Sequence, residues 1–437
     1  MRAQALAYHR YPRPGKIEIV PTKPFYTPHD LSLAYSPGVA YPCLEIADDS
    51  DNVYRYTGRG NTVAVISNGT AVLGLGNIGA LAAKPVMEGK ALLFKIFAGL
   101  DAFDVEIDES DPKKFIDIVK SLAPTFGGIN LEDIKAPECF EIEKGLVGQC
   151  GIPVMHDDQH GTAVIVGAAL INALEVQSKK IEDIRLVVNG AGAAAIACTR
   201  LMCALGVRRE NLVMCDSKGA ITTARSGLNP QKQEFASDRT DVVTLGDAVK
   251  GADVFVGLSV ADVLSPEMLA TMADKPVVFA LANPDPEISR DKALATRKDL
   301  VYATGRSDYP NQINNVLGFP YIFRAALDCR ATEINEAMKL AAAHAIAALA
   351  REPASKQVKD LYPDENLTFG PEYILPKPFD RRLLSTVPPA IVKAAMESGV
   401  SKRPIEELER YGRMLRRYVV DSDKALRAFL VASATGS

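Results

Sequence analysis

The chain has 437 residues, of which 47% are hydrophobic and 24% are charged, with a formal net charge of -4. This length allows two globular domains, and the acidic balance provides no basic surface for nucleic acid. No apolar run is long enough to cross a membrane, and the first residues lack the apolar core of a signal peptide. The seven cysteines form no C-x-x-C pair. We therefore expect a cytoplasmic protein with reduced thiols.

The first 30 residues are rich in proline and predict an irregular arm, of the kind that packs on a neighbouring subunit. Tyr35 follows in a Tyr-Ser-Pro-Gly corner that a plain connector would not need. Aromatic packing over a turn is the simpler interpretation of that corner. Lys90 stands between a glycine and an apolar stretch at 91–98. It is either a solvated lysine or a buried amine with a lowered pKa.

A G-x-G-x-x-G pattern at 73–79 matches a dinucleotide fingerprint. We do not expect a nucleotide there, because Lys84-Pro85 should interrupt the following helix early. No strand ending in an acidic residue follows at the interval that the fingerprint requires.

Two predicted strands each lead into adjacent acidic residues. The strand at 126–131 ends at Glu132-Asp133, a pair that is costly to crowd unless a cation or a lysine relieves the repulsion; a solvated acidic pair is the alternative. The strand at 152–155 leads into a polar run from His156 to Thr162, and we expect a helix to begin at Thr162. The run therefore marks a strand-to-helix corner, where ligands bind in open α/β sheets.

This polar run, His-Asp-Asp-Gln-His-Gly-Thr, allows three interpretations. At a corner, Asp157 and Asp158 would be hard oxygen ligands suited to magnesium or manganese. In a helix, His156 and His160 would share one face and could hold zinc. One aspartate could also simply cap the helix, although that would not explain the other polar residues.

The nucleotide signature is clearer downstream. A strand at 184–188 leads into a glycine turn at 189–195, a helix at 196–205 and a second strand at 211–215 that ends at Asp216. In the turn, glycines allow close approach of the pyrophosphate to the helix N-terminus, and the small residues permit close helix packing; these positions are Gly190, Gly192, Ala193 and Ala194. Asp216 suits the ribose hydroxyls of NAD, whereas Ser217 and Lys218 suit the 2'-phosphate of NADP.

Later loops also carry polar groups. Strands at 253–257 and 277–281 continue the sheet, and Asn283 follows the second strand. The loop at 305–315 contains Arg306, Asn314 and Asn315. Such asparagines either cap helices or orient a carboxylate substrate.

These patterns predict an α/β protein with a smaller N-terminal α/β catalytic domain followed by a doubly wound, Rossmann-type NAD(P)-binding domain. We place the catalytic domain at 1–157, the nucleotide domain at 158–400 and a C-terminal helix or linker at 401–437. The active site should lie between the two domains.

The Tyr35 corner, Lys90, the Glu132-Asp133 pair, the polar run, the glycine turn, Asn283 and the Asn314-Asn315 pair occur in one order. Together they resemble malic enzymes of the short bacterial type, which also forms the front part of hybrid proteins with a phosphotransacetylase-like domain. The resemblance covers roughly residues 12 to 420. It implies metal-dependent oxidative decarboxylation of (S)-malate to pyruvate and carbon dioxide with reduction of NAD(P).

The resemblance also implies roles for single residues. Glu132, Asp133 and Asp158 match the metal ligands, with Asp157 beside them. Lys90 matches the general base and Tyr35 the general acid. Further matches are Thr162 and Asn283 for the cofactor, and Asn283, Asn314 and Asn315 for the substrate.

The sequence departs from many larger malic enzymes at one position. Those enzymes place a substrate-binding arginine just after the residue equivalent to Gly69, where this chain has Thr70-Ala71. The group that holds the second malate carboxylate is therefore open, with Arg306 and the asparagines as candidates.

We expect Mg²⁺ or Mn²⁺ as the metal, and NADP rather than NAD as the coenzyme. We also expect an isolated malic-enzyme portion that forms a homodimer or higher homo-oligomer through its N-terminal arm. Two other functions are open: a metal-dependent oxaloacetate decarboxylase without redox chemistry, and a nucleotide-sensing module without catalysis.

Overall fold

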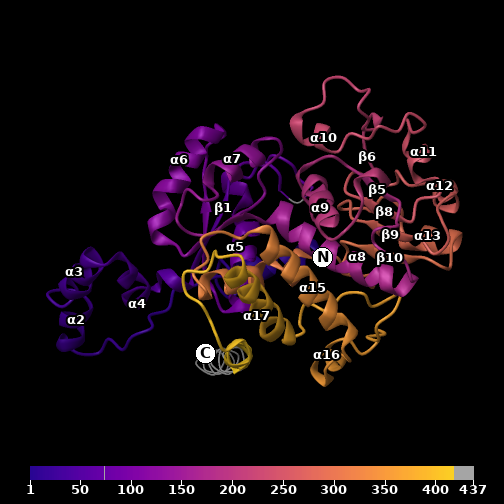
Figure 1. Cartoon of the computed structure of the whole chain (residues 1–437). Helices are drawn as coiled ribbons and strands as arrows, with labels where there is room; N and C mark the ends of the chain where they lie inside the picture. The colour runs from indigo at the N-terminus through magenta and orange to yellow at the C-terminus, as the bar shows by residue number, and fades with distance from the viewer. Residues whose placement is uncertain (73, 418–437) are drawn as a thin grey trace.

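The computed structural model describes residues 1–72 and 74–417 and contains two parallel sheets (Figure 1). The first sheet has the order β2-β1-β3-β4, and every pair in it is parallel. Its strands are β1 (Thr62–Ser67), β2 (Asp101–Glu106), β3 (Gly128–Leu131) and β4 (Val154–His156). Strands β1, β3 and β4 are buried throughout, as expected where helices cover both faces of a parallel sheet.

Three helices connect these strands: α5 (Ala80–Ala98), α6 (Pro112–Leu122) and α7 (Glu138–Leu146). The expectation that Pro85 interrupts the helix after the first glycine pattern was wrong, because α5 continues through it. Proline removes the hydrogen bond to the carbonyl of Leu81 and crowds that carbonyl. Leu81 is 86% exposed, so water can serve that carbonyl instead.

The second sheet has the order β10-β9-β8-β5-β6-β7, with only the β6–β7 pair antiparallel. Its strands are β5 (Leu186–Asn189), β6 (Leu212–Asp216), β7 (Gly219–Ala220), β8 (Val254–Gly257), β9 (Val277–Ala280) and β10 (Val301–Thr304). Around this sheet lie α9 (Ala193–Ala204), α10 (Pro230–Glu234), α11 (Leu245–Val249), α12 (Pro266–Ala270) and α13 (Arg290–Thr296). The predicted fold class is confirmed: a mixed α/β domain precedes a Rossmann-type domain.

Helix α8 (Asp157–Gln177) joins the two sheets. It begins at Asp157, so the prediction that it starts at Thr162 was wrong. His156 is its N-cap in extended conformation, and the two acidic residues of the first turn suit the positive end of the helix dipole. The polar run therefore forms the first turns of a helix.

The C-terminal helices complete both halves: α14 (Phe319–Asp328), α15 (Glu336–Arg351), α16 (Lys356–Leu361) and α17 (Arg382–Glu397). The ring of Phe94 on α5 makes edge contacts with Phe319 and Phe323 on α14. One apolar core thus includes residues of both sheets. The predicted tail at 401–437 lies partly outside the described residues; 408–417 is helical.

The proline-rich stretch is irregular as predicted, since residues 11–27 form no helix or strand, although α1 (Arg2–Arg10) precedes it. Three helices follow: α2 (Pro28–Ala34), α3 (Ala40–Asp48) and α4 (Val53–Tyr56). Thr27 and Asp30 form a capping box, which starts α2 at Pro28. No residue within these four helices is buried. Figure 1 shows α2, α3 and α4 standing away from both sheets. From here on, the arm means these residues, 28–56, and not the first 30 residues.

Both sheets change direction of strand addition near their centres. In the first sheet β2 and β3 lie on opposite sides of β1, and in the second β6 and β8 lie on opposite sides of β5. The carboxyl ends of strands at such a switch point form a crevice that binds ligands. No helix among the described residues has the length and apolar character of a membrane span.

Candidate active site

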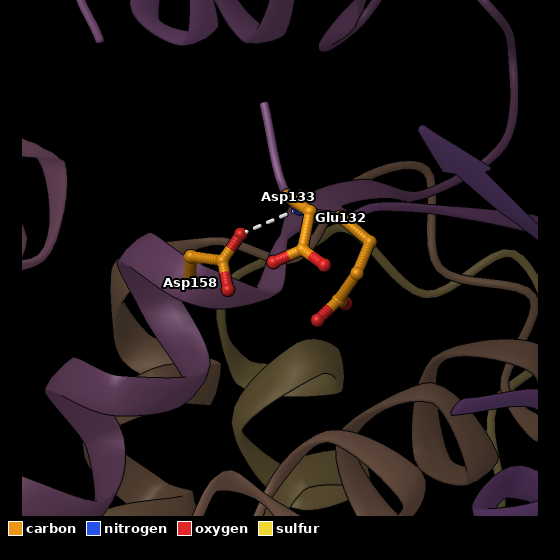
Figure 2. A group of neighbouring side chains, drawn as sticks. All are labelled: Glu132, Asp133 and Asp158. Carbon is orange, nitrogen blue, oxygen red and sulfur yellow. Dashed lines mark hydrogen bonds between the residues drawn. The ribbon is translucent and has the colours of Figure 1, made fainter. Parts of the chain in front are cut away.

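Three carboxylates meet at the carboxyl ends of β3 and β4. Glu132 and Asp133 follow β3 directly, and Asp158 lies in the first turn of α8. One oxygen of each lies within 4.8 Å of the others (Figure 2). The backbone N–H of Asp133 donates to Asp158 Oδ2 at 2.8 Å. Asp133 has φ of 53°, a conformation that costs energy for a residue with a side chain and that is concentrated at functional sites.

This cluster suits a hard divalent cation. Carboxylate oxygens are the ligands that Mg²⁺ and Mn²⁺ prefer. Burial raises the pKa of Glu132 well above its usual range, and the charges of Asp158 and Asp157 add to that effect against the opposing charge of Lys90. A cation would relieve this repulsion. Among the residues that the structure describes, the potential metal-binding group contains no histidine, which argues against zinc at the polar run.

Lys90 on α5 lies beside this cluster. Its Nζ is 2.9 Å from Glu132 Oε1 and 2.7 Å from Asp157 Oδ2, and it lies 4.2 Å from the ring centroid of Phe319. The amine is buried, as one interpretation of the sequence required. Burial alone would lower its pKa, but the charges of Asp157 and Glu132 raise the pKa well above the usual range. The expected lowered pKa is therefore wrong for the protein without a cation.

Asp157 is held tightly between the two domains. Its side chain is fully buried, and Oδ2 accepts hydrogen bonds from Lys90 and, at 3.1 Å, from Asn315 Nδ2. Asn315 Oδ1 accepts a hydrogen bond from Thr162 Oγ1 at 3.1 Å. A Cβ at Gly161 would lie 1.8 Å from Asp157 Oδ1, so only glycine leaves room for this carboxylate.

The glycine turn after β5 lies where the nucleotide signature predicts. Gly190 has φ of 130°, and a Cβ there would lie 2.3 Å from the Leu258 carbonyl oxygen. A Cβ at Gly192 would meet nothing within 4 Å, so its backbone faces open space. Ala193 and Ala194 begin α9, three residues earlier than predicted. The turn thus presents the positive end of a helix, as pyrophosphate binding requires.

Asp216 at the end of β6 is paired with two cations. Arg225 donates to both of its oxygens, at 2.9 and 3.0 Å, and Lys232 Nζ donates to Oδ2 at 2.8 Å. Partial burial alone would raise the pKa of Asp216, but these hydrogen bonds hold it well below its usual range. Lys218 donates its backbone N–H to Asp216, while Ser217 and the Lys218 side chain are exposed.

Other predicted residues lie in loops of the second domain. Asn283 Nδ2 donates to the Leu281 carbonyl at 3.4 Å, Asn314 Oδ1 caps the short helix η5 (Asn315–Leu317), and Arg306 pairs with Asp308 at 2.8 Å. Gly74 approaches the Asn283 carbonyl, since a Cβ there would lie 3.6 Å from it. The substrate roles of Asn283, Asn314 and Arg306 stay predictions.

Tyr35 is not brought to the cluster. It ends α2 in the arm and is 72% exposed, and the arm stands away from both sheets (Figure 1). The predicted acid and the predicted base therefore lie apart within one chain.

Sequence reasoning missed several residues that support the site. Asn130 Nδ2 donates to Glu132 Oε2 at 2.8 Å inside β3. Arg225 reaches Asp216 from an irregular segment and Lys232 reaches it from α10. Glu143 reaches the start of α8 from α7. Only Gly161 had a local signal. It is a glycine next to a run of helix-forming residues, at a position where alanine would favour the helix more.

The fold and the site define a two-domain α/β protein in which a dinucleotide-type sheet lies next to a buried carboxylate cluster. Residues 14–146 match the family described as "Malic enzyme, N-terminal domain" and residues 159–367 match "Malic enzyme, NAD binding domain". The chain belongs to the malic enzyme family.

Curated relatives agree with this assignment. An NADP-dependent malic enzyme of Halomonas elongata is 59% identical over 92% of this chain and 95% of its own length. An NAD-dependent malic enzyme of Rhizobium meliloti is 55% identical over 98% of this chain and 56% of its own length. The chain spans about half the length of several other curated relatives that it matches. The crystal structure of malic enzyme from Pyrococcus horikoshii superimposes with a TM-score of 0.87 at 43% identity, covering 96% of each chain.

The contact between Gly161 and Asp157 gives a first prediction. Gly161→Ala should displace the Asp157 carboxylate from Lys90, because the new Cβ would occupy the place of Oδ1. The thermal midpoint should fall, because breaking a buried ion pair costs about 3–5 kcal/mol, more than the roughly 1 kcal/mol that alanine gains over glycine in a helix. A crystal structure of the variant and its thermal midpoint check both statements. An unchanged Asp157–Lys90 contact would contradict them.

Proposed function

We propose that this protein catalyses the oxidative decarboxylation of (S)-malate to pyruvate and carbon dioxide, with a divalent metal and NADP. The observation that carries the proposal is the position of Lys90. Its ammonium lies between Glu132 and Asp157, at the edge of a three-carboxylate cluster. Membership of the malic enzyme family and the Rossmann-type sheet support it.

The carboxylates Glu132, Asp133 and Asp158 would hold Mg²⁺ or Mn²⁺. When bound, such an ion chelates the hydroxyl and carboxylate of malate, polarises the carbonyl and stabilises enolate charge. Neutralising the cluster also weakens the field that holds a proton on Lys90.

The residues of the chain would then act in order. Lys90 takes the proton of the malate hydroxyl while a hydride leaves the same carbon for the nicotinamide. Asp157 and Asn315 keep the Lys90 amine at the reacting atom. Loss of carbon dioxide from the resulting oxaloacetate leaves an enolate, and Tyr35 supplies the proton to its carbon.

Three assays test this function. With Mn²⁺, malate and NADP, the protein should form NADPH, pyruvate and carbon dioxide in equal amounts. Asp158→Asn should lose Mn²⁺ binding and turnover but keep its NADP affinity, while Asp117→Asn, an exposed change on α6, should match the parent. Decarboxylation of oxaloacetate without any malate-dependent NADPH would favour a simple decarboxylase. NADP binding without either reaction would favour a nucleotide sensor.

We propose NADP as the preferred coenzyme because of the charges around Asp216. Two cations face this one carboxylate, so the region where a ribose 2' position would lie keeps a positive excess. A free aspartate would repel a 2'-phosphate, but here Arg225 and Lys232 already neutralise it. This proposal shifts the selective role from Ser217 and Lys218 to Arg225 and Lys232.

Lys232→Ala should lower kcat/KM for NADP by roughly 10- to 100-fold, the cost of one hydrogen bond to a charged group, and change kcat/KM for NAD little. Lys218→Ala is the matched control, because the exposed Lys218 contacts Asp216 through its backbone. A parent that prefers NAD, or equal effects of both substitutions, would rule out the role of Lys232.

We propose that the protein works as a dimer in which the arm of one chain completes the site of the other. The arm exposes large apolar side chains from α2 to α4: Leu31, Leu33, Tyr35, Val39, Tyr41, Leu44 and Tyr56. An apolar surface of this kind marks an interaction site. A second copy of the chain is the partner that also explains why Tyr35 lies away from Lys90.

Mixed dimers test this arrangement. Tyr35→Phe and Lys90→Met chains should each be inactive alone. Co-expressed, they should recover about one quarter of parental turnover per chain, because random pairing in a two-fold dimer makes one complete site in each mixed pair. If Tyr35 serves its own chain, no mixture can contain a complete site, and turnover stays at the level of the separate variants.

A further inference from the structure

A chain of half-buried polar side chains lies behind the start of α8. Glu143 on α7 accepts the backbone N–H of His156 at 2.9 Å through Oε1. The same oxygen is 3.0 Å from His160 Nε2. The other ring nitrogen of His160, Nδ1, is 3.1 Å from Lys339 Nζ on α15. The three side chains thus connect α7, α8 and α15.

The donors and acceptors of this chain fit one protonation pattern. Lys339 as an ammonium can only donate, so His160 Nδ1 accepts its hydrogen. His160 Nε2 then carries the proton and donates to Glu143.

These contacts brace the turn that carries the proposed metal ligand. The Glu143 carboxylate contacts the backbone N–H of His156 and the ring of His160. Asp158 lies between these two positions in the first turn of α8. On the other side, the backbone N–H of Asp133 fixes Asp158 Oδ2. Glu143 and His160 lie outside the group of three carboxylates that could hold the cation, and they bond to each other and to the backbone of His156.

We propose that Glu143 and His160 are positioning residues for the divalent cation: they hold the first turn of α8 so that Asp158 meets Glu132 and Asp133. The inference rests on the proposed metal-dependent function. Residues that orient metal ligands are commonly worth 10- to 100-fold in metal affinity. Through Lys339 the network also links α15 to the first turns of α8. Both α7 and α15 therefore help to position Asp158.

The surroundings allow this role to be tested without unfolding the protein. Glu143, His160 and Lys339 line a cavity of about 950 Å³ between α7, α9 and α15. Water in such a space can pair with groups that lose a partner. Substituting one member should therefore leave the fold intact.

The experiment uses Mn²⁺ alone as the probe, with the free ion measured by electron paramagnetic resonance. Glu143→Gln and His160→Leu should each weaken Mn²⁺ binding by about 10- to 100-fold. His160→Gln should restore it to nearly the parental value, because a glutamine amide offers one donor and one acceptor at similar spacing to the ring nitrogens. Glu141→Gln, an exposed change on the same helix, is the control. NADP affinity and the thermal midpoint should stay close to the parent in all variants.

Three results would overturn the inference while leaving the metal assignment intact. Mn²⁺ affinity could be parental in Glu143→Gln and His160→Leu. His160→Gln could be as weak as His160→Leu, which would show that the ring and not its hydrogen bonds matters. NADP affinity and thermal midpoint could fall together with Mn²⁺ affinity, which would make the role a general structural one. A parent that binds no Mn²⁺ would instead overturn the metal assignment and this inference with it.

Discussion

The structure depends most on the buried ammonium of Lys90, which lies between Glu132 and Asp157. An ion buried without a partner costs several kcal/mol, so neither the amine nor these carboxylates could occupy the site alone. The amine is one positive charge beside four acidic residues, with Asp133 and Asp158 as the other two. The site is therefore stable with Lys90 charged and still short of positive charge, which is the condition that favours a divalent cation.

The topology explains why these groups meet although they are far apart in sequence. Parallel strands place their carboxyl ends at one edge, so the ends of β3 and β4 bring Glu132 and Asp158 together, and the switch of direction at β1 leaves room for a ligand. Helix α8 starts at this edge and continues into the second domain, where Asn315 contacts Asp157. The carboxylate cluster and the nucleotide sheet are thus set in place by one helix.

Much of this arrangement could be predicted from local patterns. Apolar runs ending in polar residues located the strands, and the glycine turn followed by Asp216 located the nucleotide domain. The start of α8 could not be predicted, because the place of Asp157 depends on Lys90, which lies 67 residues earlier. The prediction of a lowered pKa for Lys90 was wrong for the same reason, because the carboxylates that raise its pKa come from the end of β3 and the start of α8. The position of Tyr35 depends on how the arm packs, and no local pattern encodes that.

Anomalous scattering from crystals soaked in Mn²⁺ tests the central claim most directly, since it locates the ion without relying on turnover. We expect one peak per chain, within coordination distance of Glu132, Asp133 and Asp158. A peak at His156 and His160, or no peak at this cluster at saturating Mn²⁺, would contradict the account.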